Sequence, residues 1–308
     1  MGIERAMRQR SEAQCRGFTL VEMITVISIM AVIAAAAAVF IRGPVQAYQD
    51  AQRRATITGT ADTVFGLVKR ELQTALPNSV RVTTVGSVVY LEFLQMRTAG
   101  RYRSADTNPA VASTANTCAD TNANGFAEEN VLQFGTADTC FTTLGALSSL
   151  SAIVPNSDFV VVYNLGTGFT GADAYASGAA TGGNKSLITS AAAGSGGENV
   201  ITFQSNTFNL ESPGRRFQVI GGPVTFECDP GAGTLRRISG YAIAAVQQTP
   251  PAGTSARVAD GISGCTFVYD QNVINQRQGV VSIWLRFSDP AGGTTVNLFQ
   301  QVQVSNVP

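Results

Sequence analysis

Glu22 is a carboxylate inside an otherwise apolar stretch, CRGFTLVEMITVISIMAVIAAAAAVFIRG, and it raises the first chemical question about this chain. The apolar run from Phe18 to Ile41 has 24 residues, which form a helix roughly 36 Å long at about 1.5 Å per residue. A bilayer core is about 30 Å thick, so the run can span a membrane with some tilt. A charge inside such a span costs about 2.5–3.5 kcal/mol or more, so Glu22 needs a partner or a route to water.

The segment before the apolar run has a surplus of basic residues, which predicts a cytoplasmic N-terminus. They are Arg5, Arg8, Arg10 and Arg16, against Glu4 and Glu12. A plain membrane anchor with Glu22 at the headgroups and a secretory signal cut within Ala34–Ala38 both remain possible. A lipoprotein signal is excluded, because no apolar run precedes Cys15.

Composition argues against most catalytic sites. The 308 residues contain no histidine, which removes the commonest general base and the commonest metal ligand. A catalytic Ser-His-Asp or Cys-His arrangement therefore cannot form within this chain. The net charge is zero, so there is no basic surplus for nucleic acid. We expect no catalytic residue, no cofactor and no metal site.

A long helix must position Glu22. After Ile41, the residues Arg42-Gly43-Pro44 are expected to loosen or kink the helix, and the pattern beyond them is amphipathic. One face of this second part carries apolar residues three or four positions apart, namely Ile57, Ala61, Val64, Val68, Leu72 and Leu76. Pro77 predicts the end of the helix, so we expect one helix over 18–76, with 18–41 spanning a membrane and 45–76 amphipathic.

Residues 77–308 are expected to form a β-rich domain, which makes the chain an α+β protein. Alternation of apolar and polar residues predicts a hairpin of 80–85 and 88–94 around Gly86-Ser87. Residues 97–150 are expected to be irregular, and 166–197 to be a long loop. The other predicted strands are 158–165, 200–203, 207–210, 216–220, 224–228, 234–238, 256–260, 265–270, 280–288 and 294–304.

The six residues Gly17-Phe18-Thr19-Leu20-Val21-Glu22 resemble the processing signal of the type IV pilin family. The resemblance implies a leader, residues 1–17, that prepilin peptidase removes by cutting between Gly17 and Phe18. It also implies N-methylation of Phe18, and a role for Glu22 as the charge partner of a neighbouring subunit's amine during assembly. Two buried charges are tolerable when paired and costly when one is missing.

Four cysteines would remain after removal of a leader that contains Cys15, and an even number outside the cytoplasm suggests disulfides. Three connectivities are possible. We favour Cys118–Cys140 and Cys228–Cys265, because each closes a local loop. Free buried cysteines are the alternative.

Several later segments are similar to the O-type minor pilins of the mannose-sensitive haemagglutinin (MSHA) pilus system, and share an outline with J-type minor pseudopilins of type II secretion and W-type minor pilins. The resemblance lies in FIRGPVQAYQDAQRRATITGTADTVFGLVKRELQTALPNSVRV, GPVTFECDPGAGTLRRISGY, SGCTFVYDQNVINQRQGVVSIWLRFSD and VSNVP. Residues 97–200 are the part least similar to these families, so we expect any property specific to this protein there.

One stretch has the oxygen spacing of a calcium loop. It contains Asp120, Asn122 and Asn124, followed by Gly125, Glu128 and Glu129. The glutamate that an EF-hand needs at position twelve is replaced by Val131. An Asn/Gly turn beside a disulfide is the favoured interpretation of the stretch, so no metal is assigned.

These patterns favour a minor pilin over a J-type pseudopilin, with a membrane-anchored enzyme or sugar-binding module as the third alternative. For the minor pilin we expect a single-pass inner-membrane protein whose β-rich domain is periplasmic before it enters the pilus, near its tip. The expected partners are prepilin peptidase, other minor pilins, the major pilin and the assembly platform, with no nucleic acid.

Overall fold

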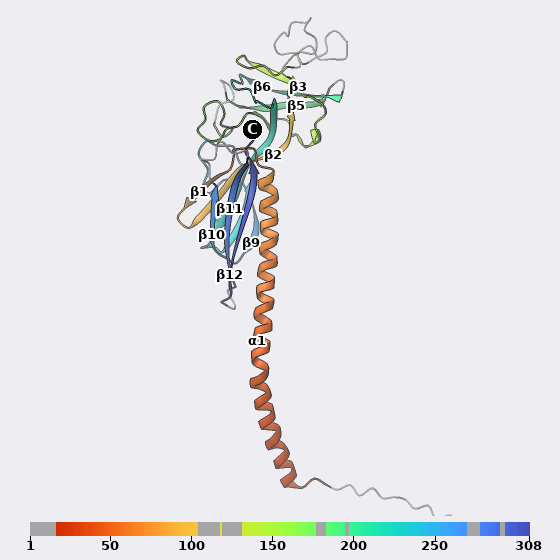
Figure 1. The fold of residues 1–308 in the computed structure, drawn as a ribbon, viewed down its shortest axis with the longest axis vertical. Coiled ribbons are helices and arrows are strands. Elements are labelled where there is room, and N and C mark those ends of the chain that lie inside the picture. Colours follow the sequence, from red (N-terminus) through yellow and green to blue (C-terminus); the bar gives the residue numbers. More distant parts are fainter. Residues whose placement is uncertain are drawn as a thin grey trace, which may run out of the picture. The chain divides into compact units, whose positions relative to one another are not determined.

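The computed structural model describes residues 17–103, 118, 131–176, 183–194, 197–269, 278–289 and 293–308. The chain divides into two compact units, residues 1–53 and 54–308. Helix α1 (Leu20–Gln73) is followed by strands and one short 3-10 helix, η1 (Leu150–Ala152), so the chain has a long N-terminal helix and an antiparallel β-rich domain (Figure 1). This is the α+β, pilin-like fold class that the sequence predicts.

Helix α1 begins two residues later and ends three residues earlier than expected. Its secondary structure continues through Gly43 and Pro44 without a break. It stops at Gln73 because the backbone of the next turn pairs with a strand: the Leu76 N–H donates to the Leu94 carbonyl at 2.8 Å.

The expected apolar stripe packs in the second unit. Ala61, Val64, Val68 and Leu72 are buried together with Phe65, which lies beside the predicted positions. They join a core formed with the β-sheet residues Leu91, Phe93, Phe226 and Leu235. The face with a helical repeat is therefore the face that the β-domain covers.

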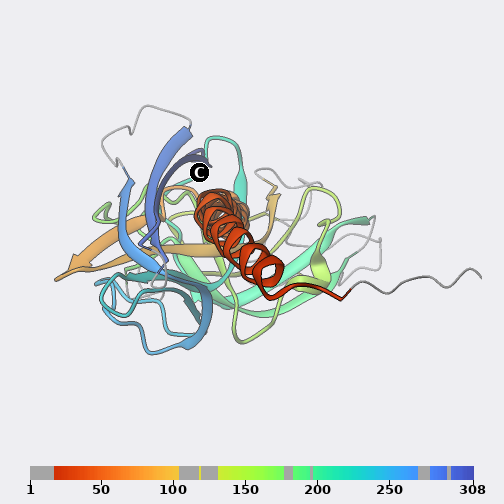
Figure 2. The ribbon, with the colours of Figure 1, turned by 90° about the horizontal axis from the view of Figure 1, so that it is seen from below.

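Most of the strands form one nine-stranded sheet with the order β1-β2-β7-β4-β5-β6-β3, in which β8 pairs with β7 and β9. These strands are β1 (Arg81–Val85), β2 (Val88–Arg101), β3 (Asp138–Thr142), β4 (Phe159–Val162), β5 (Lys185–Ala193), β6 (Asn199–Asn206), β7 (Arg216–Asp229), β8 (Thr234–Ser239) and β9 (Thr254–Asp260). A second sheet holds β10 (Ile262–Tyr269), β11 (Gln278–Ser288) and β12 (Thr295–Ser305). Strands β5 and β6 lie at the opposite side of the domain from the blue strands of the second sheet (Figures 1 and 2).

Strand β7 is the central element of the domain. Its first half pairs with β4 and its second half with β8, while β2 runs along the whole of it. Gly221-Gly222-Pro223 lies between the halves, and the register with β2 shifts there. The domain has two large cores. One contains the buried helix residues and the sheet residues that pack on them, and the other surrounds Phe141, Phe203 and Phe217.

Three predictions, those for residues 97–150, 166–197 and 207–210, were wrong. The expected loop 166–197 contains β5, and the expected irregular region 97–150 contains β3 and the end of β2. The predicted strand 207–210 makes only an isolated bridge at Phe208. The predicted strands 216–220 and 224–228 are confirmed as strand, and they are joined without a break in the single strand β7. The β1–β2 hairpin is confirmed, with Val85 opposite Val88 and Gly86 at φ 60°.

A buried ion pair links β1 to β2. The Arg81 guanidinium donates to Glu92 Oε1 at 2.9 and 2.6 Å, and the Glu92 side chain is 1% exposed. Tyr241 donates to the other carboxylate oxygen at 3.0 Å, and burial together with the Glu92 charge raises the pKa of Tyr241. Arg81 also lies over the ring of Tyr175, 3.6 Å from its centroid.

Replacing Glu92 by Gln should lower the free energy of unfolding by about 3–5 kcal/mol, because it leaves the Arg81 charge buried without its counterion. Chemical denaturation of the full chain in detergent measures this change. The R81Q/E92Q double variant is expected to be destabilised by less than the sum of the two single changes. Strict additivity would show that the two charges are not coupled.

Candidate assembly site at the start of helix α1

Gly17 and Phe18 lie in an extended segment just before helix α1. The Phe18 side chain is 82% exposed, and a Cβ placed on Gly17 would have no atom within 4 Å. The bond between these residues is therefore open to an enzyme, as a cleavage site requires.

Thr19 and Glu22 form a reciprocal capping box around the first turn. The Glu22 N–H donates to Thr19 Oγ1 at 3.3 Å, while the Thr19 N–H and hydroxyl donate to Glu22 Oε2 at 3.4 and 3.3 Å. This is the S/T-x-x-E arrangement, which satisfies N–H groups that a helix start otherwise leaves without partners. Glu22 thus already has a partner within its own chain.

The capping role of Glu22 was not among the sequence predictions, although the spacing Thr19-x-x-Glu22 indicates it. The predicted role concerned only a counterion for the carboxylate, and not the unpaired N–H groups at the helix start. The two roles differ chemically, because a glutamine can complete the capping box but cannot neutralise an amine.

A continuous apolar surface follows the capping box. Its large side chains are 51–85% exposed and comprise Leu20, Val21, Met23, Ile24, Val26, Ile27, Ile29, Met30, Val32, Ile33, Val39, Phe40 and Ile41. Two hydroxyls within the run bond to their own helix, Thr25 Oγ1 to the Glu22 carbonyl at 2.9 Å and Ser28 Oγ to the Ile24 carbonyl at 2.8 Å. The run therefore presents little unsatisfied polarity to an apolar environment.

By length and composition, α1 is the one helix among the described residues that can cross a membrane, and its apolar window is not buried within the protein. A carboxylate in its first turn interacts favourably with the helix dipole, whereas an amine there does not. If cleavage exposed an amine at Phe18, a carboxylate near the helix start would offset two positive charges. These are the charge of the amine and the partial charge at the N-terminal end of the helix dipole.

Four of the five cysteines form two local pairs in the structure, Cys118–Cys140 and Cys228–Cys265. The first joins residue 118 to β3, and the second joins β7 of the large sheet to β10 of the small one. These pairs have the connectivity that loop length favours.

No group of three or more His, Cys, Asp or Glu side chains suitable for a metal occurs in the described part of the chain. The calcium hypothesis concerns Asp120, Asn122, Asn124, Glu128 and Glu129, which lie outside the described residues.

Lys185 is a buried cation with a structural role. Burial lowers the pKa of Lys185 to about 8, against the opposing effect of Asp173. Its Nζ donates to the carbonyls of Ala174 and Ala176 at 2.7 and 2.6 Å. Lys185 therefore holds the loop after β4 against β5.

Comparison with known proteins gives one match, to the family "Prokaryotic N-terminal methylation motif" over residues 13–38. The match covers the Gly17–Phe18 bond, the capping box and most of the apolar run. It supports the assignment of the chain to the type IV pilin-like proteins, a class that includes the pseudopilins. Proteins of this class are processed by prepilin peptidase and anchored in the membrane by the N-terminal helix. No curated protein and no solved structure was found to match the chain.

Replacing Thr19 by Ala should weaken the first turn of α1 by about 0.5–2 kcal/mol, because the Glu22 N–H loses its acceptor. Amide hydrogen exchange of the full chain in detergent should show faster exchange at Glu22. Thr25→Ala is the matched control, because Thr25 bonds only to a carbonyl of its own helix. Equal exchange in T19A and the wild type would argue against the capping box.

Proposed function

We propose that this chain is a minor pilin of an MSHA-type pilus, which acts in the initiation of assembly or at the filament tip. The observation that carries the proposal is the methylation motif at the start of a helix whose first part is exposed and apolar and whose last turns pack in a β-domain. The resemblance of several segments to O-type minor pilins supports the assignment to this pilus type.

In this proposal residues 1–17 are a leader, and prepilin peptidase cuts between Gly17 and Phe18. Phe18 then becomes the N-methylated terminus. Residues 18–41 anchor the chain in the inner membrane, and residues 77–308 lie in the periplasm until the subunit enters the filament. Its partners are the assembly platform, other minor pilins and the major pilin.

Glu22 changes partners during assembly. Before assembly its carboxylate completes the capping box with Thr19. In the filament it pairs with the terminal amine of a neighbouring subunit, so that both charges can leave the membrane surface together. An unpaired charge in an apolar core is costly, which makes correct placement a condition for insertion.

The alternative function is that of a J-type minor pseudopilin in a type II secretion system. The hairpin of β7 and β8 bears on it, because its residues GPVTFECDPGAGTLRRISGY contain the Thr-Leu-x-Arg strand found in both groups. Both functions require the same apolar helix, and they differ in the assembly that the subunit joins, a pilus or a type II secretion system. Recovery of the protein from purified surface pili would support the minor pilin. Loss of protein secretion with intact pili, in cells that lack this protein, would support the pseudopilin.

Replacing Gly17 by Leu should block processing, because a bulky side chain would then precede the cleaved bond. Intact mass and N-terminal sequencing of protein from the native host should show a variant heavier by the leader. Wild type should begin with N-methylated Phe18 and be four hydrogens lighter than its reduced form. A wild-type start within or after Ala34–Ala38 would refute the pilin assignment.

Replacing Glu22 by Gln should preserve the capping box and abolish charge pairing. We expect normal membrane levels and incorporation into filaments reduced by at least two orders of magnitude, since a buried unpaired charge costs about 3–5 kcal/mol. Immunoblots of sheared pili and membranes measure the ratio. Asp62→Asn is the control, an exposed carboxylate on the same helix. Normal incorporation of E22Q would disprove charge pairing, and a defect confined to T19A would assign the role to the cap.

A further inference from the structure

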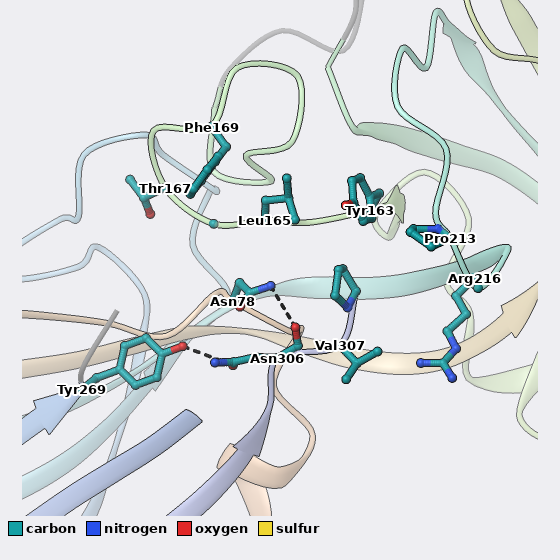
Figure 3. Close-up of a pocket in the computed structure, with 13 residues that line it drawn as sticks. Asn78, Tyr163, Leu165, Thr167, Phe169, Pro213, Arg216, Tyr269, Asn306 and Val307 are labelled. Carbon is teal, nitrogen blue, oxygen red and sulfur yellow. Dashed lines mark hydrogen bonds between the residues drawn. The ribbon is translucent and has the colours of Figure 1, made fainter. Parts of the chain in front are cut away.

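A pocket of about 590 Å³ opens where five segments of the β-domain converge (Figure 3). The segments are the turn after α1, the loop after β4, the turn before β7, the end of β10 and the residues after β12. The lining residues are Asn78, Tyr163, Leu165, Gly166, Thr167, Phe169, Pro213, Gly214, Arg216, Tyr269, Asn306, Val307 and Pro308. The volume is within the range of about 300–1,000 Å³ that is usual for small-molecule sites.

Hydrogen bonds hold the pocket floor in place. The Asn78 side-chain amide donates to the carbonyls of Asn164 and Asn306 at 2.9 and 3.3 Å. Asn164 in turn donates to the Pro77 carbonyl at 2.7 Å, and the Asn306 amide bonds to the Tyr269 hydroxyl at 3.2 Å. The segments are therefore fixed before any ligand arrives, which reduces the entropic cost of binding.

The backbone around the pocket is strained. Four described residues other than glycine have a positive φ, and three of them lie in the pocket or next to it: Asn78 at 59°, Tyr163 at 54° and Arg215 at 55°. Such conformations cost about 1–3 kcal/mol each and gather at binding and active sites. Gly166, at φ 111°, approaches so closely that a Cβ there would lie 3.1 Å from the Asn78 carbonyl oxygen.

Among the described residues that line the pocket, Arg216 alone has a charged side chain, and it is half-buried. Among the described residues it makes no ion pair and no side-chain hydrogen bond. Figure 3 shows the Arg216 side chain at one end of the pocket, with its guanidinium drawn beside Val307. A half-buried guanidinium without a counterion favours a ligand with one negative charge, and its planar geometry matches a carboxylate, which it can bind through two parallel hydrogen bonds.

The rest of the lining combines aromatic rings with hydrogen-bonding groups. Tyr163, Phe169 and Tyr269 supply flat apolar surface, and Figure 3 shows Tyr163 and Phe169 on one side of the pocket with Tyr269 on the other. The hydroxyls of Tyr163 and Thr167 can serve as donors or acceptors. Sugars present both C–H faces and hydroxyls, and this mixture suits them better than a purely apolar molecule.

We propose that this pocket binds a saccharide that carries a carboxylate, a uronic-acid type of sugar, with Arg216 on the carboxylate and Tyr163 and Phe169 along the ring. This ligand site is independent of the methylated N-terminus. It gives the β-domain a binding function beside filament assembly, and the proposal stands whether the chain serves a pilus or a secretion system.

The test is calorimetric titration of the full chain, purified in detergent, with D-galacturonate. We expect saturable binding of D-galacturonate. D-galactose, which lacks the carboxylate, and propionate, which lacks the sugar ring, should each bind at least about tenfold more weakly. Trigalacturonate distinguishes the source. Tighter binding than the monomer indicates a polymer, and equal binding indicates a free sugar acid or a chain end.

Arg216→Gln should weaken galacturonate binding about tenfold or more, since a charge-assisted pair is lost. Arg286→Gln, at an exposed arginine outside this pocket, is the control and should bind as wild type does. Thr167→Trp fills the pocket from an exposed loop position and should also abolish binding, which guards against misfolding of R216Q. The proposal is overturned if galacturonate does not bind saturably at millimolar concentrations, if propionate binds equally well, or if R216Q binds like the wild type.

Discussion

The central constraint on this protein is that the first part of helix α1 cannot remain in water. From Leu20 to Ile41 its large side chains are exposed around the whole circumference, so no single contact within the chain could cover them. The hydrophobic effect requires another apolar environment, which a bilayer or a bundle of similar helices supplies. The capping box at Thr19 and Glu22 fits this constraint, because it satisfies the polar start of the helix from within the helix itself.

The second part of the same helix meets a different requirement. Beyond Arg53 only one face is apolar, and Ala61, Val64, Val68 and Leu72 contribute it to the core of the β-domain. Glu71 forms an ion pair with Arg237 of β8 at 2.8 Å, at the margin of that core. One helix therefore serves two environments, and the change in its pattern of apolar residues separates them.

The β-domain is organised by β7, whose Gly221-Gly222-Pro223 segment lets one strand belong to two cores. Tyr163 packs against one of these cores and Tyr269 against the other, and both line the pocket that contains Arg216. The backbone has a positive φ at two of the lining residues, Asn78 and Tyr163. Polar residues around the pocket bond mainly to backbone carbonyls, so the loops are held without a regular strand. The result is a concave surface formed by residues that are distant in sequence from the methylation motif at 13–38.

The sequence by itself determined the features that depend on local pattern. The processing motif, the apolar span, the buried stripe and the β1–β2 hairpin can all be read from neighbouring residues, because a helix face and a two-residue turn are short-range properties. Tertiary structure decided the rest. Strand β5 is rich in alanine and serine and is stabilised by pairing with β4 and β6 on either side, and β7 continues through a Gly-Gly-Pro sequence because β2 shifts its register to match. The pocket could not be predicted, since its lining comes from five distant segments that only the packing of the two cores brings together.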